Sequence, residues 1–158
     1  MYPTDLQDDA SARSLLSEDQ CGFDDPGKVF PDGEYGWAKL TGELQLRAFH
    51  RQYGVDAMAC RLFTAYGERE NESHAVVALI AKALAELDPY PGWGDGTQTR
   101  NFTYVGDIVL GLAHAGAGAS GFDVVNVGSP VHTSVRELID VIFEVTGFQP
   151  GRTARRCR

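Results

Sequence analysis

Two side chains of this sequence, those of Tyr35 and Lys39, have the chemistry to move a proton together. They stand four positions apart in a segment that predicts a helix over residues 34–53, so both are expected on one helix face. A phenol is a poor base at neutral pH, but a neighbouring ammonium favours its phenolate form. The tyrosine could then take a proton from a substrate hydroxyl while hydride leaves the same carbon. The lysine could also hydrogen-bond the ribose of a nicotinamide cofactor. The same spacing is typical of a solvated surface pair, so the pair alone identifies no site.

The elements expected to position this pair alternate between helices and strands. Helices are predicted over residues 34–53, 73 or 74–87, 107–115 and 134–145, and strands over residues 55–63, 90–93, 101–105 and 122–127. Asp107 is expected to cap its helix, and Ser134 forms a capping box with Glu137 at the start of the last one. Alternating elements of these lengths indicate an α/β fold with some parallel sheet.

The composition argues against several other classes of function. A formal charge of -8 is unlike that of a protein that binds the phosphate backbone of DNA or RNA. Cys21, Cys60 and Cys157 are too few and too scattered for a disulfide framework or a zinc site, so no metal is expected. The sequence shows neither a signal-peptide pattern nor the roughly 18 apolar residues of a membrane span. A cytoplasmic location is therefore expected.

Three segments of the chain carry motifs in a fixed order. They are Tyr35-Gly36-Trp37-Ala38-Lys39-Leu40 with Gly42-Glu43, then Arg61-Leu62-Phe63-Thr64-Ala65-Tyr66-Gly67, then the run from Gly94-Asp95-Gly96 to Asp107. In this order and spacing the segments resemble the extended short-chain dehydrogenase/reductase family. Within that family they are similar to the NAD-dependent epimerase/dehydratase group, which acts on nucleotide-sugars.

The resemblance implies roles for five residues. Tyr35 would be the catalytic acid/base and Lys39 its partner, and both would contact the cofactor, NAD or NADP. The backbone around Phe63 would meet the nicotinamide. Thr64 stands where the family usually has an asparagine that binds the substrate. Arg100 stands where the family has an arginine that binds the nucleotide diphosphate. The implied partner is a nucleoside-diphosphate sugar, and a family-type homodimer is expected if the fold is completed.

The glycine-rich dinucleotide-binding half of the family has no counterpart in this sequence. The implied fold is therefore the carboxyl-terminal part of a Rossmann-like doubly wound sheet plus the smaller substrate-binding subdomain. Residues 1–158 would form a single partial domain. Within it, residues 1–33 are expected as a loop-rich lead-in, 34–67 as the catalytic helix and strand, and 68–158 mainly as the substrate-binding portion.

The implied function is an NAD-dependent nucleotide-sugar epimerase, in which hydride transfer forms a transient keto-sugar and Tyr35 acts as acid/base. Three alternatives stay open. The chain could belong to a nucleotide-sugar 4,6-dehydratase, or to a reductase that uses the same tyrosine and lysine on simpler substrates. It could also be a non-catalytic, truncated substrate-domain fragment that needs a partner chain. The sequence identifies neither the sugar nor the nucleotide base.

Overall fold

The computed structural model describes residues 2, 16–25, 28–29, 31, 33–92 and 94–150. These residues form two compact units, and each unit draws on two stretches of the chain. As far as they are described, Met1–Phe63 and Gly106–Gly128 make up unit 1, and Thr64–Val105 and Ser129–Arg158 make up unit 2. Each unit therefore joins residues that are distant in the sequence.

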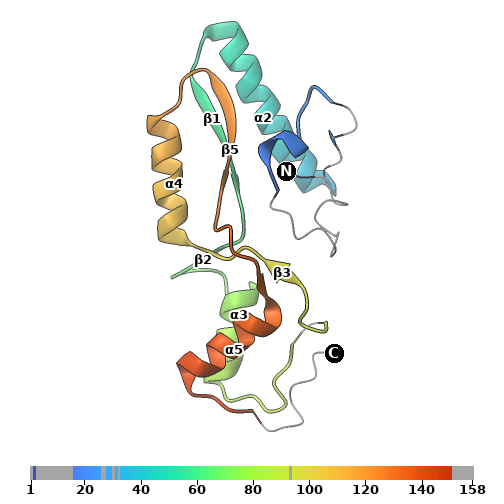
Figure 1. Ribbon diagram of the computed structural model, residues 1–158, viewed down its shortest axis with the longest axis vertical. Coiled ribbons are helices and arrows are strands. Elements are labelled where there is room, and N and C mark those ends of the chain that lie inside the picture. Colours follow the sequence, from blue (N-terminus) through green and yellow to red (C-terminus); the bar gives the residue numbers. More distant parts are fainter. Residues whose placement is uncertain are drawn as a thin grey trace. The chain divides into compact units, whose positions relative to one another are not determined.

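Unit 1 contains two parallel strands with a helix on each face (Figure 1). Its elements are η1 (Glu18–Gln20), α2 (Gly33–Tyr53), β1 (Ala57–Leu62), α4 (Val105–Ala117) and β5 (Phe122–Val127). Arg61 of β1 points to α2, where it bonds Glu43, and Val127 of β5 points to α4, where it lies against Gly111. Arg61 pairs with Asn126, so these two side chains lie on the same face of the sheet. Val127 follows Asn126 directly, so its side chain lies on the opposite face from that of Arg61. The layers of unit 1 are thus α2, sheet and α4.

The helix α2 forms where its sequence predicts one. Gly36, Leu40 and Glu43 follow one another at spacings of four and three, and they are the buried residues of the helix. Gly54 ends α2 with a φ of 67°, a left-handed conformation that glycine adopts without strain, and its N–H donates to His50 O at 2.8 Å. The buried stripe therefore holds α2 against the strands of unit 1.

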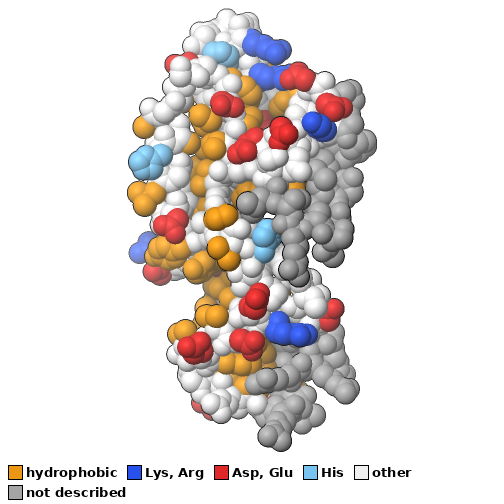
Figure 2. Space-filling model, in the orientation of Figure 1, with side chains coloured by type: hydrophobic (Ala, Val, Ile, Leu, Met, Phe, Trp, Pro, Cys, Tyr) orange, Lys and Arg blue, Asp and Glu red, His pale blue; other side chains and the backbone are white. Residues whose placement is uncertain are grey.

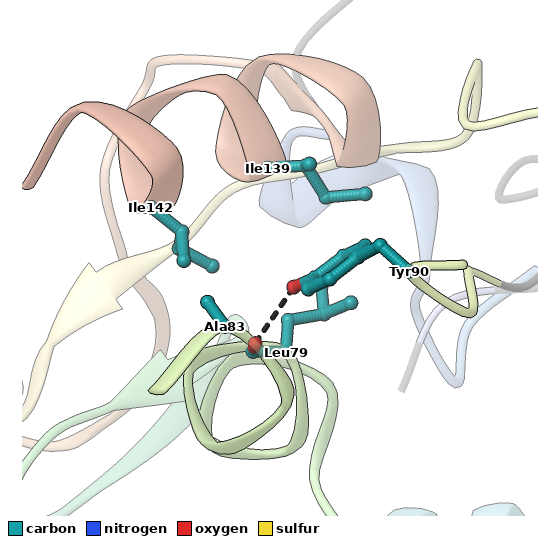
Figure 3. Close-up of a cluster of buried hydrophobic side chains, with 5 residues drawn as sticks. All are labelled: Leu79, Ala83, Tyr90, Ile139 and Ile142. Atoms are coloured by element: carbon teal, nitrogen blue, oxygen red, sulfur yellow. Dashed lines mark hydrogen bonds between the residues drawn. The ribbon is translucent and has the colours of Figure 1, made fainter. Parts of the chain in front are cut away.

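Unit 2 is centred on two helices and two very short strand pairs. Its elements are β2 (Ala65–Tyr66), α3 (Ala75–Leu84), β3 (Thr99–Arg100), β4 (Thr103–Tyr104), β6 (Thr133–Ser134) and α5 (Val135–Thr146). β2 and β4 pair in parallel, and β3 and β6 pair antiparallel. A cluster of buried side chains joins α3 to α5, as Figure 3 shows: Leu79, Ala83, Tyr90, Ile139 and Ile142. The Tyr90 hydroxyl donates to Leu79 O at 2.7 Å.

Most predicted elements are confirmed to within a few residues. The strand over residues 122–127 is confirmed at both ends, and the capping box of Ser134 and Glu137 opens α5 as expected. None of the helices in the described ranges is both long and apolar enough to cross a bilayer.

Three local predictions are wrong. Residues 90–92 form no strand, because Tyr90 packs into the cluster between α3 and α5 instead; Trp93 lies outside the described residues. The strand predicted over residues 101–105 is limited to β4, since residues 101–102 are irregular and α4 already begins at Val105. Asp107 consequently lies in the first turn of α4 and does not cap the helix.

Candidate active site

Tyr35 and Lys39 lie in the first two turns of α2. Their four-residue spacing brings the side chains together, with Lys39 Nζ 5.3 Å from the centroid of the Tyr35 ring. Tyr35 is 68% exposed, and Lys39 is exposed as well. The predicted proximity of a phenol and an ammonium on one helix face is therefore observed, and both groups are open to a ligand.

Phe63 follows β1 directly and belongs to unit 1. Its N–H donates to Val127 O at 3.1 Å, and its ring stacks on Tyr2 with the centroids 6.4 Å apart. A Cβ atom on Gly128 would lie 2.8 Å from the Phe63 side chain, so the chain passes too close here for any residue but glycine. These contacts fix the backbone at the carboxyl end of β1.

Thr64 and Arg100 belong to unit 2. The carbonyl of Thr64 accepts a hydrogen bond from Thr103 N at 2.8 Å, and the Thr64 residue is exposed. Arg100 lies on β3, and its Nη1 donates to Thr99 O at 2.8 Å, a bond to the residue just before it. Its guanidinium is exposed and has further N–H groups with which to bind an anion.

Unit 1 also contains a buried ion pair that the sequence analysis missed. Arg61 Nε and Nη2 donate to the two carboxylate oxygens of Glu43 at 3.0 and 2.8 Å. The same guanidinium donates to Cys21 O at 2.9 Å and to Glu18 O at 3.3 Å, and it lies 5.1 Å from the centroid of the Tyr2 ring. One arginine therefore connects β1, α2 and the amino-terminal segment.

The electrostatics of this pair favour the charged form of both partners. Burial alone would raise the pKa of the Glu43 carboxyl, but the hydrogen bonds from Arg61 outweigh it and hold that pKa below its usual range. Burial would lower the pKa of Arg61, and its bonds to Glu43 raise it instead. Because Glu43 lies one turn beyond Lys39 on α2, the pair fixes the helix that carries the candidate proton-transfer residues.

The sequence did carry a signal for this pair. Arg61 is the lone charged residue in the otherwise uncharged strand Ala57–Leu62, and Glu43 continues the buried stripe of Gly36 and Leu40. A charge at a position that the pattern assigns to the interior needs a partner of opposite sign. When an acidic and a basic residue occupy two such interior positions on neighbouring elements, they are expected to form an ion pair.

Within the described ranges, no three His, Cys, Asp or Glu side chains come together as a metal site would require. Within the described residues, neither Cys21, which is buried, nor Cys60, which is half-buried, forms a disulfide. In unit 1, the Tyr35 hydroxyl and the Lys39 ammonium are exposed groups that could hold part of a cofactor.

Two relatives show what the chain is similar to. It is 33% identical over 121 residues to a UDP-glucose 4-epimerase of Mycolicibacterium smegmatis, covering 75% of this chain and 39% of the relative. It is 31% identical over 147 residues to a UDP-glucuronate 4-epimerase of Thermodesulfobacterium geofontis, covering 90% of this chain and 44% of the relative. The chain thus spans less than half the length of the curated relatives it matches.

The fold has a counterpart in a solved structure. The structure of a UDP-glucuronic acid 4-epimerase from Bacillus cereus, in complex with UDP-glucuronic acid and NAD, superposes with a TM-score of 0.72 at 28% identity. The match covers 87% of this chain and 42% of that one, and it confirms the predicted Rossmann-like α/β class. The family model described as the NAD dependent epimerase/dehydratase family matches residues 17–128. This chain belongs to the NAD-dependent epimerase/dehydratase family.

Proposed function

We propose that this chain supplies the proton-transfer residues and the substrate side of an NAD(P)-dependent nucleotide-sugar epimerase. The observation that carries the proposal is the exposed Tyr35 ring with Lys39 Nζ at 5.3 Å, on a helix held by a buried ion pair. Both relatives named above are 4-epimerases by name, which favours epimerisation over 4,6-dehydration.

The chemistry assigned to Tyr35 is proton transfer in both directions. Its phenolate removes the proton from a hydroxyl of the sugar while the hydrogen on the same carbon leaves as hydride, and a keto-sugar forms. A bound NAD would supply the acceptor for this hydride and its donor in the return step. Tyr35 gives the proton back to the sugar oxygen after the keto-sugar has presented its opposite face, so the configuration at that carbon is inverted. Lys39 favours the phenolate and holds the cofactor ribose.

The residues of unit 1 fit one end of the cofactor. Tyr35 and Lys39 offer a hydroxyl and an ammonium to the nicotinamide ribose, and the backbone beside Phe63 offers polar groups to the nicotinamide. The pyrophosphate needs a glycine-rich turn between a strand and a helix, which the 158-residue sequence does not contain. The proposal therefore assigns to this chain the nicotinamide end alone.

The substrate contacts are assigned to unit 2. The free N–H groups of Arg100 suit two phosphate oxygens at once. Thr64 offers a shorter side chain than the asparagine usual at this position, so its contact is expected to be the weaker one. In this proposal residues 34–67 carry the proton transfer and residues 68–158 mainly bind the nucleotide-sugar.

A second candidate function is a non-catalytic, substrate-binding piece that acts only with a partner chain. The chain spans 39% and 44% of the lengths of the two relatives, and its 158 residues contain no glycine-rich turn. The two candidates share the substrate site and differ in whether Tyr35 transfers a proton.

The role of Tyr35 can be tested in a chimera in which this chain replaces the matched part of the M. smegmatis relative. We expect the chimera to interconvert UDP-glucose and UDP-galactose, and Tyr35→Phe to lower turnover about 10²–10⁴-fold, because the general base is lost. Tyr53→Phe, at an exposed ring in the last turn of the same helix, is the matched control and should leave turnover unchanged. Equal turnover in Tyr35→Phe and Tyr53→Phe would rule out the assigned role.

The substrate class can be tested with the chain itself by titration calorimetry against UDP-, GDP- and dTDP-glucose. We expect one of the three to bind, and Arg100→Gln to weaken that binding about tenfold or more, since a charge-assisted hydrogen bond is lost. Arg51→Gln, at an exposed arginine in the last turn of α2, should bind like the parent chain. Binding that is insensitive to Arg100→Gln would remove Arg100 from the substrate site.

A further inference from the structure

The neighbours of Lys39 on α2 include one negative charge. Residues three and four positions away on a helix lie beside a given side chain, and for Lys39 these are Tyr35, Gly36, Gly42 and Glu43. Side chains on a helix lean toward its amino terminus, so Glu43 leans toward Lys39 as Lys39 leans toward Tyr35. The helix spacing alone therefore predicts an ion pair between Lys39 and Glu43.

The carboxylate of Glu43 is held by another group. It accepts hydrogen bonds from Arg61 Nε at 3.0 Å and from Arg61 Nη2 at 2.8 Å, one on each oxygen. No carboxylate of the described residues forms an ion pair with Lys39. The Lys39 ammonium lies 5.3 Å from the centroid of the Tyr35 ring. The structure thus keeps apart the two charges that the helix spacing would bring together.

Further contacts fix the orientation of Arg61. Its Nη2 also donates to Cys21 O at 2.9 Å and its Nη1 to Glu18 O at 3.3 Å. Its guanidinium lies 5.1 Å from the centroid of the Tyr2 ring. These contacts hold the planar guanidinium in one orientation, and a bidentate bond to a carboxylate depends on that orientation. Arg61 therefore holds the Glu43 side chain, which is 10% exposed, on the buried side of α2.

Without Arg61, the carboxylate would be drawn toward Lys39. Arg61 is the one charged residue of β1, and Figure 2 shows hydrophobic side chains gathered in a strip over the strands of unit 1. A carboxylate in such surroundings needs a partner of opposite sign, and the exposed Lys39 ammonium is one helical turn away. The new ion pair would reduce the positive charge that acts on the Tyr35 phenol.

We propose that Arg61 is a positioning residue, which keeps the Lys39 ammonium available to Tyr35 and to the cofactor by holding the carboxylate of Glu43. The Arg61–Glu43 pair is neutral as a whole, so the Lys39 charge beside the phenol stays uncompensated. The consequence for catalysis rests on the proposed function. The competition between Arg61 and Lys39 for Glu43 does not.

The two halves of the ion pair are expected to differ in importance. Arg61→Gln and Glu43→Gln both break the charged bidentate bond, so a role in alignment alone would make them about equally harmful. If Arg61 protects Lys39, Arg61→Gln does the greater harm, because only this variant leaves a carboxylate beside the ammonium. The double variant Arg61→Gln/Glu43→Gln removes that carboxylate and should recover the additional loss.

NMR of the ¹⁵N-labelled Lys39 ammonium measures the competition directly, in the full chain with an acetylated amino terminus. Acetylation removes the positive charge of that terminus, which also acts on Glu43. We expect the ammonium protons of Arg61→Gln to exchange with water about threefold more slowly than those of the parent chain, because an ion pair shields them. Glu43→Gln and the double variant should exchange at the parent rate. Lys82, which donates to Pro91 O, is the internal reference and should not change.

Equal exchange at Lys39 in Arg61→Gln and in the parent chain would overturn the proposal. If Arg61→Gln does not fold, Arg61→Lys replaces it. A single ammonium holds a carboxylate less firmly than the planar guanidinium, so exchange at Lys39 should again be slower than in the parent chain. An unchanged rate in a folded Arg61→Lys would overturn the proposal as well.

The consequence for catalysis is measured in the chimera with the M. smegmatis relative. We expect Arg61→Gln to lower kcat about tenfold more than Glu43→Gln does, and to weaken NAD binding. KM for the nucleotide-sugar should be the same in both variants, since its contacts are assigned to unit 2. The double variant should have the kcat of Glu43→Gln. Slower exchange at Lys39 together with equal kcat in the two single variants would leave the competition in place and contradict the role proposed for Lys39. If the parent chimera is inactive, the proposed function fails, and exchange at Lys39 alone decides between Arg61 as a positioning residue and Arg61 as a structural one.

Discussion

Units 1 and 2 bury different chemistry at their centres. Unit 1 is tied together by the Arg61–Glu43 ion pair, whose side chains are 6% and 10% exposed. Unit 2 is held by an apolar cluster between α3 and α5, in which the Tyr90 ring meets Phe143 with the centroids 4.9 Å apart. The first centre depends on the geometry of a few hydrogen bonds, and the second depends on filled volume.

This difference matches the roles proposed for the units. A bidentate pair between β1 and α2 fixes how far the helix is rotated and displaced along the sheet, since two parallel hydrogen bonds tolerate little misalignment. Tyr35 and Lys39 on the same helix need that precision for proton transfer. An apolar cluster tolerates volume-conserving changes. Unit 2 requires no such alignment to present the exposed Arg100.

The largest expected effect comes from Arg61→Ala. The change removes the two hydrogen bonds that Arg61 donates to the buried carboxylate of Glu43, which costs about 3–5 kcal/mol of unfolding free energy. The loss should be confined to unit 1, so native-state hydrogen exchange should become faster in α2, β1 and β5 and change little in α3 and α5. Replacing Arg61 and Glu43 together by Met and Leu should recover most of the stability, because neither buried position then carries a charge.

The reciprocal control is Leu79→Ala, which opens a cavity in the cluster of unit 2 and costs about 2–5 kcal/mol. Its effect should appear in α3 and α5 and spare the amides of α2. If either variant speeds exchange equally in both units, the units unfold together and the contrast between their centres has no consequence for stability.

The sequence predicted the structure correctly where that structure depends on residues close together in the chain. The spacing of Tyr35 and Lys39 placed them on one helix face, and the capping box at Ser134 located the start of α5. Periodicity likewise located β5. These features depend on residues at most one helical turn or one strand apart.

The sequence was uninformative wherever distant segments decide the outcome. Residues 90–93 were predicted as a strand, but the partners of Tyr90 are on α3 and α5. Arg61 and Glu43 are 18 positions apart, and their pairing depends on how α2 packs on β1. The assigned roles of Thr64 and Arg100 remain predictions for the same reason.

The smallest expected effect concerns Tyr90, whose hydroxyl is the only polar side-chain group among the five buried residues of the unit 2 cluster. Burial raises the pKa of Tyr90 from 10.0 to about 12. A raised pKa means that folding favours the neutral phenol, so this contribution to stability is complete below pH 10 and is lost between about pH 10 and 12. Tyr90→Phe should cost about 0.5–1.5 kcal/mol at neutral pH, because the bond to Leu79 O is lost. It should also remove part of the alkaline decline.

The measurement is the urea unfolding of unit 2 at intervals from pH 8 to pH 12, for the parent chain and for Tyr90→Phe. The stability difference between them should shrink, and then reverse in sign, as the pH passes through this window. Tyr53→Phe, at a ring that is 63% exposed on α2, should follow the parent chain at every pH. A difference between Tyr90→Phe and the parent that stays constant up to pH 12 would mean that the phenol escapes to solvent before it ionises. The cluster of unit 2 would then be more mobile than its packing implies, and the contrast with unit 1 would become one of rigidity as well as chemistry.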